Sequence, residues 1–282
     1  MFAKPECKRC FQRQARQSAQ RIGLDSVATE NLLIAVTQRL DQTPADEIPP
    51  VTASEIHALI RERSGNPDPY REAKAEATEH ALSLYPKLKA MVAESDDPLE
   101  TAVRLAIAGN IIDLGVSEQY DLEASIERVL TTAPAIDHML QLKQALGKAS
   151  SVLFLADNAG ETVMDRLLIE QLTIPVTYVV KGGPAVNDAT REDAIAAGLD
   201  QVCKIIDQGA ATLGTLLEQC SDDFRRRFDT AELIIAKGMA NYESLSGNRN
   251  NIFFLLQAKC AVVADDLGVT EKALIVLKNS PQ

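Results

Sequence analysis

The chain has 282 residues, of which 46% are hydrophobic but only 4% aromatic, so aliphatic side chains must supply most of the packing. Its formal net charge of −11 repels phosphate backbones and argues against nucleic-acid binding. No apolar run reaches the roughly 18 residues of a membrane span, and the charged start MFAKPECKRC lacks a signal core. We therefore predict a cytoplasmic protein with no membrane contact, and the odd number of cysteines fits a reducing compartment.

The first half of the chain has a helical pattern throughout. Apolar residues recur at helical spacing over residues 10–22, 27–40, 53–63, 70–93, 98–115, 122–130 and 136–146. Prolines mark several of the breaks, and no run of this half has the period of a strand. We predict an all-helical N-terminal domain over residues 1–149.

From residue 150 onward, strand-like and helical segments alternate. Short apolar runs lie at residues 152–156, 176–180, 201–206, 233–236 and 252–256, with 273–277 as a further candidate. Helical stretches at 162–172, 188–197 and 213–228 separate most of them. This alternation is typical of a mostly parallel sheet with right-handed crossovers, so we predict an α/β domain over residues 150–282.

A polar turn, Asp157-Asn158-Ala159-Gly160-Glu161, follows the first of these strands and leads into a helix. In open α/β sheets, ligands bind at the edge where the strands end, and this turn lies at that edge. Helix capping is an alternative, because Asn158 is a good N-cap and Glu161 is its natural partner three residues later. Capping does not explain Asp157, so the turn is also a candidate site for a metal ion or a phosphate.

Polar clusters also follow later strands, at residues 181–190, 237–243 and 257–260. Asp157, Asn158 and Asp188 offer three hard oxygen ligands that suit Mg²⁺ or Mn²⁺, although Asp188 or Thr190 is also a candidate helix cap. Lys259 or Lys237 would neutralise the charge of a bound phosphate. No GxGxxG or GxxxxGK[ST] motif occurs, which argues against a dinucleotide enzyme and a P-loop enzyme.

Two features of the helical half are weaker signals. Cys7 and Cys10 have the spacing of half a zinc site, but no second CxxC follows, so structural thiols are the simpler interpretation. Asn110 and Asp113 lie one turn apart on one helix. Their default role is hydrogen bonding between helices, and the alternative is that they reach into the cleft.

Taken together, these motifs make the chain similar to the metal-dependent damage-control phosphatase family, in particular to its compact microbial members. The resemblance rests on ADNAGE (156–161), KGGPAVNDAT (181–190), AKGMANYESL (236–245) and LQAKC (256–260), in this order. AGNIIDLG and KPECxxC also resemble the compact members, so the likeness covers nearly the whole chain.

The resemblance implies a three-layer α/β/α Rossmann-like sheet behind a helical N-terminal part. It implies a divalent cation (Mg, Mn, Co or Ni) bound by Asp157, Asn158 and Asp188, and a small phosphorylated metabolite as substrate. It also implies that the lysine matching Lys259 binds phosphate and that the segment containing Asn241 contacts the substrate. The residues expected to bind substrate are Glu161, Lys237, Asn241, Asn110 and Asp113.

We therefore predict a phosphatase that hydrolyses sugar phosphates or damaged cofactor precursors, with Asp157, Asp188 and Lys259 as the catalytic residues. A metal-activated water or a carboxylate is the nucleophile, and both remain open. Two other functions fit the same sheet: a methyltransferase-like transferase, and a non-catalytic protein that binds a metal or a metabolite. A transferase of this kind would need a glycine-rich first loop, which the chain lacks.

Overall fold

The computed structural model describes residues 1–109, 122–249 and 251–280. Within these ranges, seven strands form one sheet in the order β1-β7-β6-β5-β2-β3-β4. The strands are β1 (Ile136–Asp137), β2 (Val152–Leu155), β3 (Val176–Val180), β4 (Lys204–Asp207), β5 (Ile234–Lys237), β6 (Ile252–Gln257) and β7 (Leu274–Lys278). Neighbouring strands are parallel except β6 and β7, which are antiparallel. The predicted, mostly parallel α/β sheet is confirmed.

Helices precede the sheet and alternate with its strands. They are α1 (Pro5–Arg21), α2 (Ser26–Asp41), α3 (Pro49–Ser64), α4 (Arg71–Glu94), α5 (Pro98–Gly109), α6 (Leu122–Thr131), α7 (Met139–Leu146), α8 (Thr162–Ile169), α9 (Arg191–Ala196), α10 (Asp222–Thr230), α11 (Gly238–Leu245) and α12 (Ala261–Leu267). None of the described helices combines the length and the apolar character that crossing a membrane requires.

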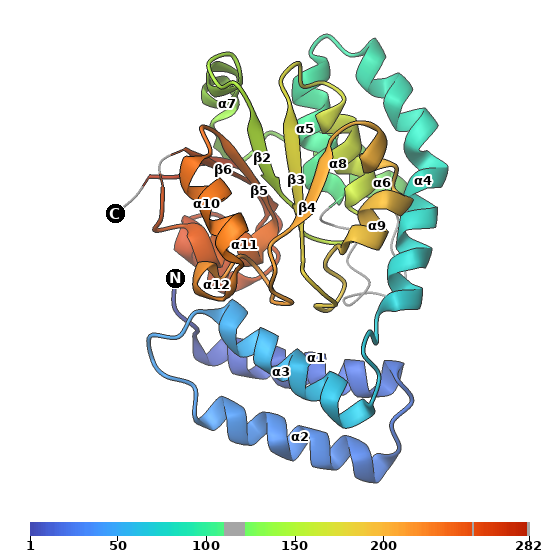
Figure 1. The fold of residues 1–282 in the computed structure, drawn as a ribbon, viewed down its shortest axis with the longest axis vertical. Helices are drawn as coiled ribbons and strands as arrows, with labels where there is room; N and C mark the ends of the chain where they lie inside the picture. Colours follow the sequence, from blue (N-terminus) through green and yellow to red (C-terminus); the bar gives the residue numbers. More distant parts are fainter. Residues whose placement is uncertain (110–121, 250, 281–282) are drawn as a thin grey trace.

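The two faces of the sheet are covered by different helices, as Figure 1 shows. Val152 and Phe154 of β2 pack into a core shared with α4, α5, α8 and α9. Leu153 and Leu155, which alternate with them along the strand, pack on the other side with α10, α11 and α12. Successive side chains of a strand point to opposite faces of the sheet, and every residue of β2 is apolar. The strand is therefore buried on both faces.

Helices α1–α3 form a separate layer with its own apolar cluster, which includes Phe11, Val36 and Ile56. The layer lies across the lower end of the sheet in Figure 1, and Leu213, in the loop after β4, packs against it. The Leu213 amide also donates a hydrogen bond of 2.9 Å to Ser54 Oγ in α3. Helices α1–α3 therefore cover loops at the carboxyl edge of the sheet, whereas α4 and α5 share the core of the sheet. The domain boundary at residue 150 stays a prediction.

Two predicted helices differ from the structure for local reasons. The segment predicted as a helix over residues 136–146 begins instead with β1, because Ile136 pairs with Ile275 in β7 and the helix starts only at Met139. The stretch predicted as one helix over 213–228 contains a short 3₁₀ turn and then α10. The break lies at Ser221, whose hydroxyl accepts a bond from the amide of Phe224 and so caps α10.

The glycine in the turn after β2 gives the first testable prediction. A Cβ on Gly160 would lie 2.9 Å from Ala77 Cβ in α4, closer than such carbons approach in proteins. We expect Gly160→Ala to lower the free energy of unfolding by about 1–3 kcal/mol, the usual cost of overpacking. The matched control is Gly147→Ala, where φ is −71° and the nearest atom lies 3.6 Å away. In urea unfolding, the free energy of unfolding of Gly147→Ala should equal that of the wild type or be slightly higher. Equal stability of the two variants would contradict the close contact with α4.

Candidate active site

Two turns at the carboxyl edge of the sheet are joined by backbone hydrogen bonds. The amide of Ala189, after β3, donates to the carbonyl of Asp157, after β2, at 2.8 Å. The amide of Ala159 donates in return to the carbonyl of Asn187, also at 2.8 Å, and Asn158 and Asp188 form an isolated antiparallel bridge. This pairing brings together the three residues predicted to bind a metal ion.

Capping does not account for these residues. The N-cap of α8 is Glu161 rather than Asn158, and its side chain makes no capping bond. The N-cap of α9 is Thr190, whose backbone amide bonds Asp193 Oδ2 at 2.8 Å, so Asp188 has no capping role. The alternative in which Asn158, Glu161 and Asp188 only begin helices is therefore wrong.

The acids at this edge are crowded and buried. Only 8% of the Asp157 surface is exposed, and burial raises the pKa of its carboxyl well above the usual range. The negative charges of Glu161 and Asp188 raise it further, whereas the positive charges of Lys259 and Lys181 lower it. A site that opposes the ionisation of its own carboxylate in this way favours the binding of a cation.

The amide of Asn158 has a defined orientation. Its Nδ2 donates to Asp157 Oδ2 and to Glu161 Oε2, each at 3.1 Å. These two bonds use both protons of the amide and leave Oδ1 as the atom that can bind a cation.

The donors at this edge fit a divalent cation. Asp157, Asn158 and Asp188 supply two carboxylates and one amide oxygen. Among the described residues, no three His, Cys, Asp or Glu side chains form a group that could hold a metal ion. Mg²⁺ usually binds through one or two carboxylates and keeps several waters, so this donor set fits a partly hydrated cation.

Two lysines follow strands at the same edge. Lys259, which comes directly after β6 and Ala258, is partly exposed, and its charge acts on Asp157. Lys181, after β3, is buried and lies 3.3 Å from Asp188 Oδ2 while it donates to the carbonyl of Gly214 at 2.7 Å. Lys181 was not among the site residues predicted from the sequence. The signal was present, because Lys181-Gly182 directly follows β3, just as Lys237-Gly238 lies at the end of β5.

Lys237 and Asn241, predicted to bind substrate, have buried side chains with several protein partners. Lys237 Nζ donates to Glu161 Oε1, to Asp165 Oδ1 at 2.6 Å and to the carbonyl of Ala106 at 2.8 Å. Asn241 Nδ2 donates to the carbonyls of Ala156 and Lys237, at 3.1 and 2.8 Å. These side chains join β5 and α11 to the end of β2.

Gly238 is a further residue of the site that the sequence analysis missed. Its φ is +78°, a conformation that favours glycine, and a Cβ here would overlap the carboxylate of Asp157. The junction of β5 and α11 therefore packs directly on the Asp157 side chain. Nothing local in the sequence marks this contact, because it joins segments about 80 residues apart in the chain.

The predicted substrate contacts Asn110 and Asp113 lie outside the described residues. The helix before them ends at Gly109, where a Cβ would lie 3.1 Å from Glu161 Cγ and 3.0 Å from Met164 Cβ. The end of α5 therefore packs on the start of α8, beside Glu161.

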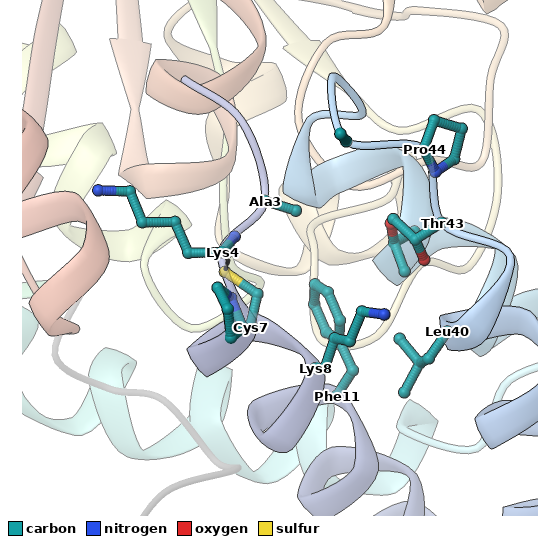
Figure 2. A pocket seen from close by; sticks show the side chains of 11 residues that line it. Ala3, Lys4, Cys7, Lys8, Phe11, Leu40, Thr43 and Pro44 are labelled. Carbon is teal, nitrogen blue, oxygen red and sulfur yellow. Dashed lines mark hydrogen bonds between the residues drawn. The ribbon is translucent and has the colours of Figure 1, made fainter.

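The two cysteines of the CxxC motif lie in α1, within the layer that covers loops at this edge. Cys7 lines a cavity of about 330 Å³ between the start of α1 and the end of α2, with Lys8, Phe11 and Leu40 (Figure 2). Cys7 Sγ accepts a bond from the backbone amide of Lys4, and Cys10 Sγ accepts from Arg13 and Gln14. Of the predicted site residues that the structure describes, none lines this cavity.

Comparison with known proteins identifies the family. The profile of the family described as "Damage-control phosphatase ARMT1-like domain" matches residues 3–275. The chain is 36% identical over 289 residues to the uncharacterized protein MJ0202 of Methanocaldococcus jannaschii, covering 98% of this chain and 95% of that protein. It is 34% identical over 281 residues to the damage-control phosphatase PH1575 of Pyrococcus horikoshii, covering 97% of both.

A solved structure agrees with this assignment. The crystal structure of the duf89 family protein ph1575 from Pyrococcus horikoshii superposes with a TM-score of 0.91 at 33% identity, over 99% of this chain and 100% of that one. A damage-control phosphatase of Archaeoglobus fulgidus is 38% identical over 226 residues, which cover 77% of this chain and 78% of that protein. The resemblance noted from the motifs is thus confirmed over nearly the full length, and this chain belongs to the damage-control phosphatase ARMT1-like domain family.

Proposed function

We propose that this phosphatase hydrolyses phosphate monoesters of small metabolites, such as sugar phosphates or damaged cofactor precursors, with a divalent cation held by Asp157, Asn158 and Asp188. The observation that carries the proposal is the pairing of the turns after β2 and β3, which groups these three oxygen donors beside two lysines. Family membership favours this function over a methyltransferase-like enzyme or a non-catalytic binding protein.

In this proposal the carboxylates bind the cation, and a lysine binds the phosphate. Asp157 and Asp188 supply negative charge to the cation, and the buried Lys181 orients Asp188 from 3.3 Å away. The bound cation would neutralise part of the phosphate charge and polarise the phosphorus. Lys259 is partly exposed at the same edge, so we assign to it the phosphate oxygens that the cation does not contact.

Asp157→Ala tests the metal site. We expect this variant to lose phosphate-ester hydrolysis to the detection limit and to bind Mn²⁺ much more weakly in calorimetric titrations. In the metal-free protein it should be as stable as the wild type or slightly more stable, because a carboxylate crowded by Glu161 and Asp188 has been removed. Its control is Asp200→Ala, an exposed residue of the 3₁₀ helix Leu199–Gln201, which should leave hydrolysis and Mn²⁺ affinity unchanged. Hydrolysis at the wild-type rate by Asp157→Ala would rule out the assignment.

Lys259→Ala separates phosphate binding from metal binding. We expect kcat/KM to fall by about 10²-fold or more, the usual effect of losing one charge-stabilising group, while Mn²⁺ affinity stays near that of the wild type. Lys259→Arg should recover only part of the rate, since a planar guanidinium does not replace a compact ammonium group.

The control for this pair is Lys278→Ala. Lys278 is exposed and pairs with Phe253, near the start of β6, so it lies at the opposite edge of the sheet. Equal losses of metal affinity and turnover in Lys259→Ala would make the lysine structural. No loss of either would exclude it from the phosphate site.

A further inference from the structure

We propose that Lys237 is a positioning residue of the metal site, which acts through Glu161 to hold the amide of Asn158 with its oxygen toward the cation. The proposal rests on the function proposed above. It assigns to Lys237 a role different from the substrate contact that the sequence suggested.

The ammonium group of Lys237 is fully buried and has a protein acceptor for each of its three protons. The acceptors come from two helices: Glu161 Oε1 and Asp165 Oδ1 at the start of α8, and the carbonyl of Ala106 in α5. Burial opposes the charge, but Asp165 and Glu161 outweigh it and raise the pKa of Lys237. A lysine with these partners and no exposed surface cannot also bind a substrate phosphate.

The second carboxylate in this group is anchored from another strand. Tyr178 in β3 donates a bond of 2.7 Å to Asp165 Oδ2, so Asp165 joins Lys237 to the neighbouring strand. Lys237 itself ends β5, and Asn241 bonds its carbonyl at 2.8 Å. Hydrogen bonds therefore hold Lys237 both at its backbone carbonyl and at its ammonium group, and a buried charge held in this way resists displacement.

Glu161 transmits this fixed position to the site. One carboxylate oxygen, Oε1, accepts from Lys237, and the other, Oε2, accepts from Asn158 Nδ2 at 3.1 Å. The Glu161 side chain is fully buried and makes no capping bond to α8, so its contacts do not serve the helix start. Its geometry joins Lys237 to the predicted metal ligand.

The orientation of Asn158 then follows from electrostatics. With Nδ2 placed between Asp157 Oδ2 and Glu161 Oε2, both contacts are attractive. A flipped amide would bring Oδ1 within about the same distance of two carboxylate oxygens, and both contacts would be repulsive. Only one of the two orientations leaves Oδ1, rather than Nδ2, for a cation, and the contacts with Asp157 and Glu161 together select it. Partners of this kind, which orient a metal ligand from behind, commonly change metal affinity by about 10–100-fold.

The experiment compares Glu161→Gln with Glu170→Gln. Both residues lie at the ends of α8, and Glu170 is paired with Tyr85, Lys89 and Arg166, away from the site. Metal-free protein is titrated with Mn²⁺ in a calorimeter, and KM and kcat are measured with a generic phosphate monoester. The side chain in Glu161→Gln has only one acceptor oxygen, whereas Lys237 Nζ and Asn158 Nδ2 each need an acceptor. We expect Mn²⁺ affinity to fall by about 10–100-fold in Glu161→Gln and to remain unchanged in Glu170→Gln.

A double-mutant cycle tests whether Lys237 acts through Glu161. Lys237→Met should weaken Mn²⁺ binding, and the double variant should lose no more affinity than the weaker-binding single variant. Additive losses would show that the two residues act independently. Thermal melts confirm that each protein is folded at the titration temperature. If Lys237→Met does not fold, the nearly isosteric Glu161→Gln still decides whether the Glu161 contact sets metal affinity.

The outcomes separate this inference from the proposed function. Wild-type Mn²⁺ affinity in Glu161→Gln would overturn the inference. A raised KM at unchanged Mn²⁺ affinity in either variant would also overturn it and would restore the substrate contact. A wild-type protein that neither binds Mn²⁺ nor hydrolyses phosphate esters would instead contradict the proposed function.

Discussion

The candidate active site depends on two backbone hydrogen bonds that join the turns after β2 and β3. Each turn donates a backbone amide to a carbonyl of the other, so neither turn can shift without breaking a buried hydrogen bond of 2.8 Å. The parallel pairing of β2 and β3 aligns the strand ends, and these bonds then fix the last few residues. Carboxylates that repel one another are held together by the backbone, which carries no net charge of its own. A bound cation would relieve this repulsion between the carboxylates.

The grouping of these residues at one edge of the sheet could be predicted from the sequence because it depends on short-range patterns. Asp157 and Asn158 follow an apolar run of strand length, and a parallel sheet brings such strand ends to one edge. The same rule placed Asp188 and Lys259 there. Motif order added the family, which the full-length comparisons confirm. The pattern could not decide between a capped helix and a ligand site, since Asn158 and Glu161 suit both. The observed N-caps exclude the capping role, and the ligand site stays a prediction.

The rest of the site depends on contacts between distant segments. The partners of Lys237 lie 72, 76 and 131 residues away in sequence, and the close approach of Gly238 to Asp157 is of the same kind. A lysine at the end of an apolar strand is usually a solvated residue, and the convergence of several polar strand ends at one edge suggested a phosphate contact instead. The structure instead covers it with α5 and α8. Helix α5 was assigned to the helical half, yet its residues complete the core of the sheet, so the sequence pattern alone could not show that Ala106 lies above Lys237.

The charges around this edge bear on the proposed binding of a cation and a phosphate. Four carboxylates, from Asp157, Glu161, Asp165 and Asp188, face the three ammonium groups of Lys181, Lys237 and Lys259. Two of the lysines, Lys181 and Lys237, form buried ion pairs. With all of these groups ionised, four negative and three positive charges leave one net negative charge, which repels a phosphate ester. A divalent cation at the proposed site would change the sign of this charge, so that the set would attract a phosphate dianion. Because Asp157 resists ionisation in the metal-free protein, the cation must also displace a proton wherever that carboxyl is still protonated. At the proposed metal site, the crowding of these carboxylates would therefore couple substrate binding to prior metal binding.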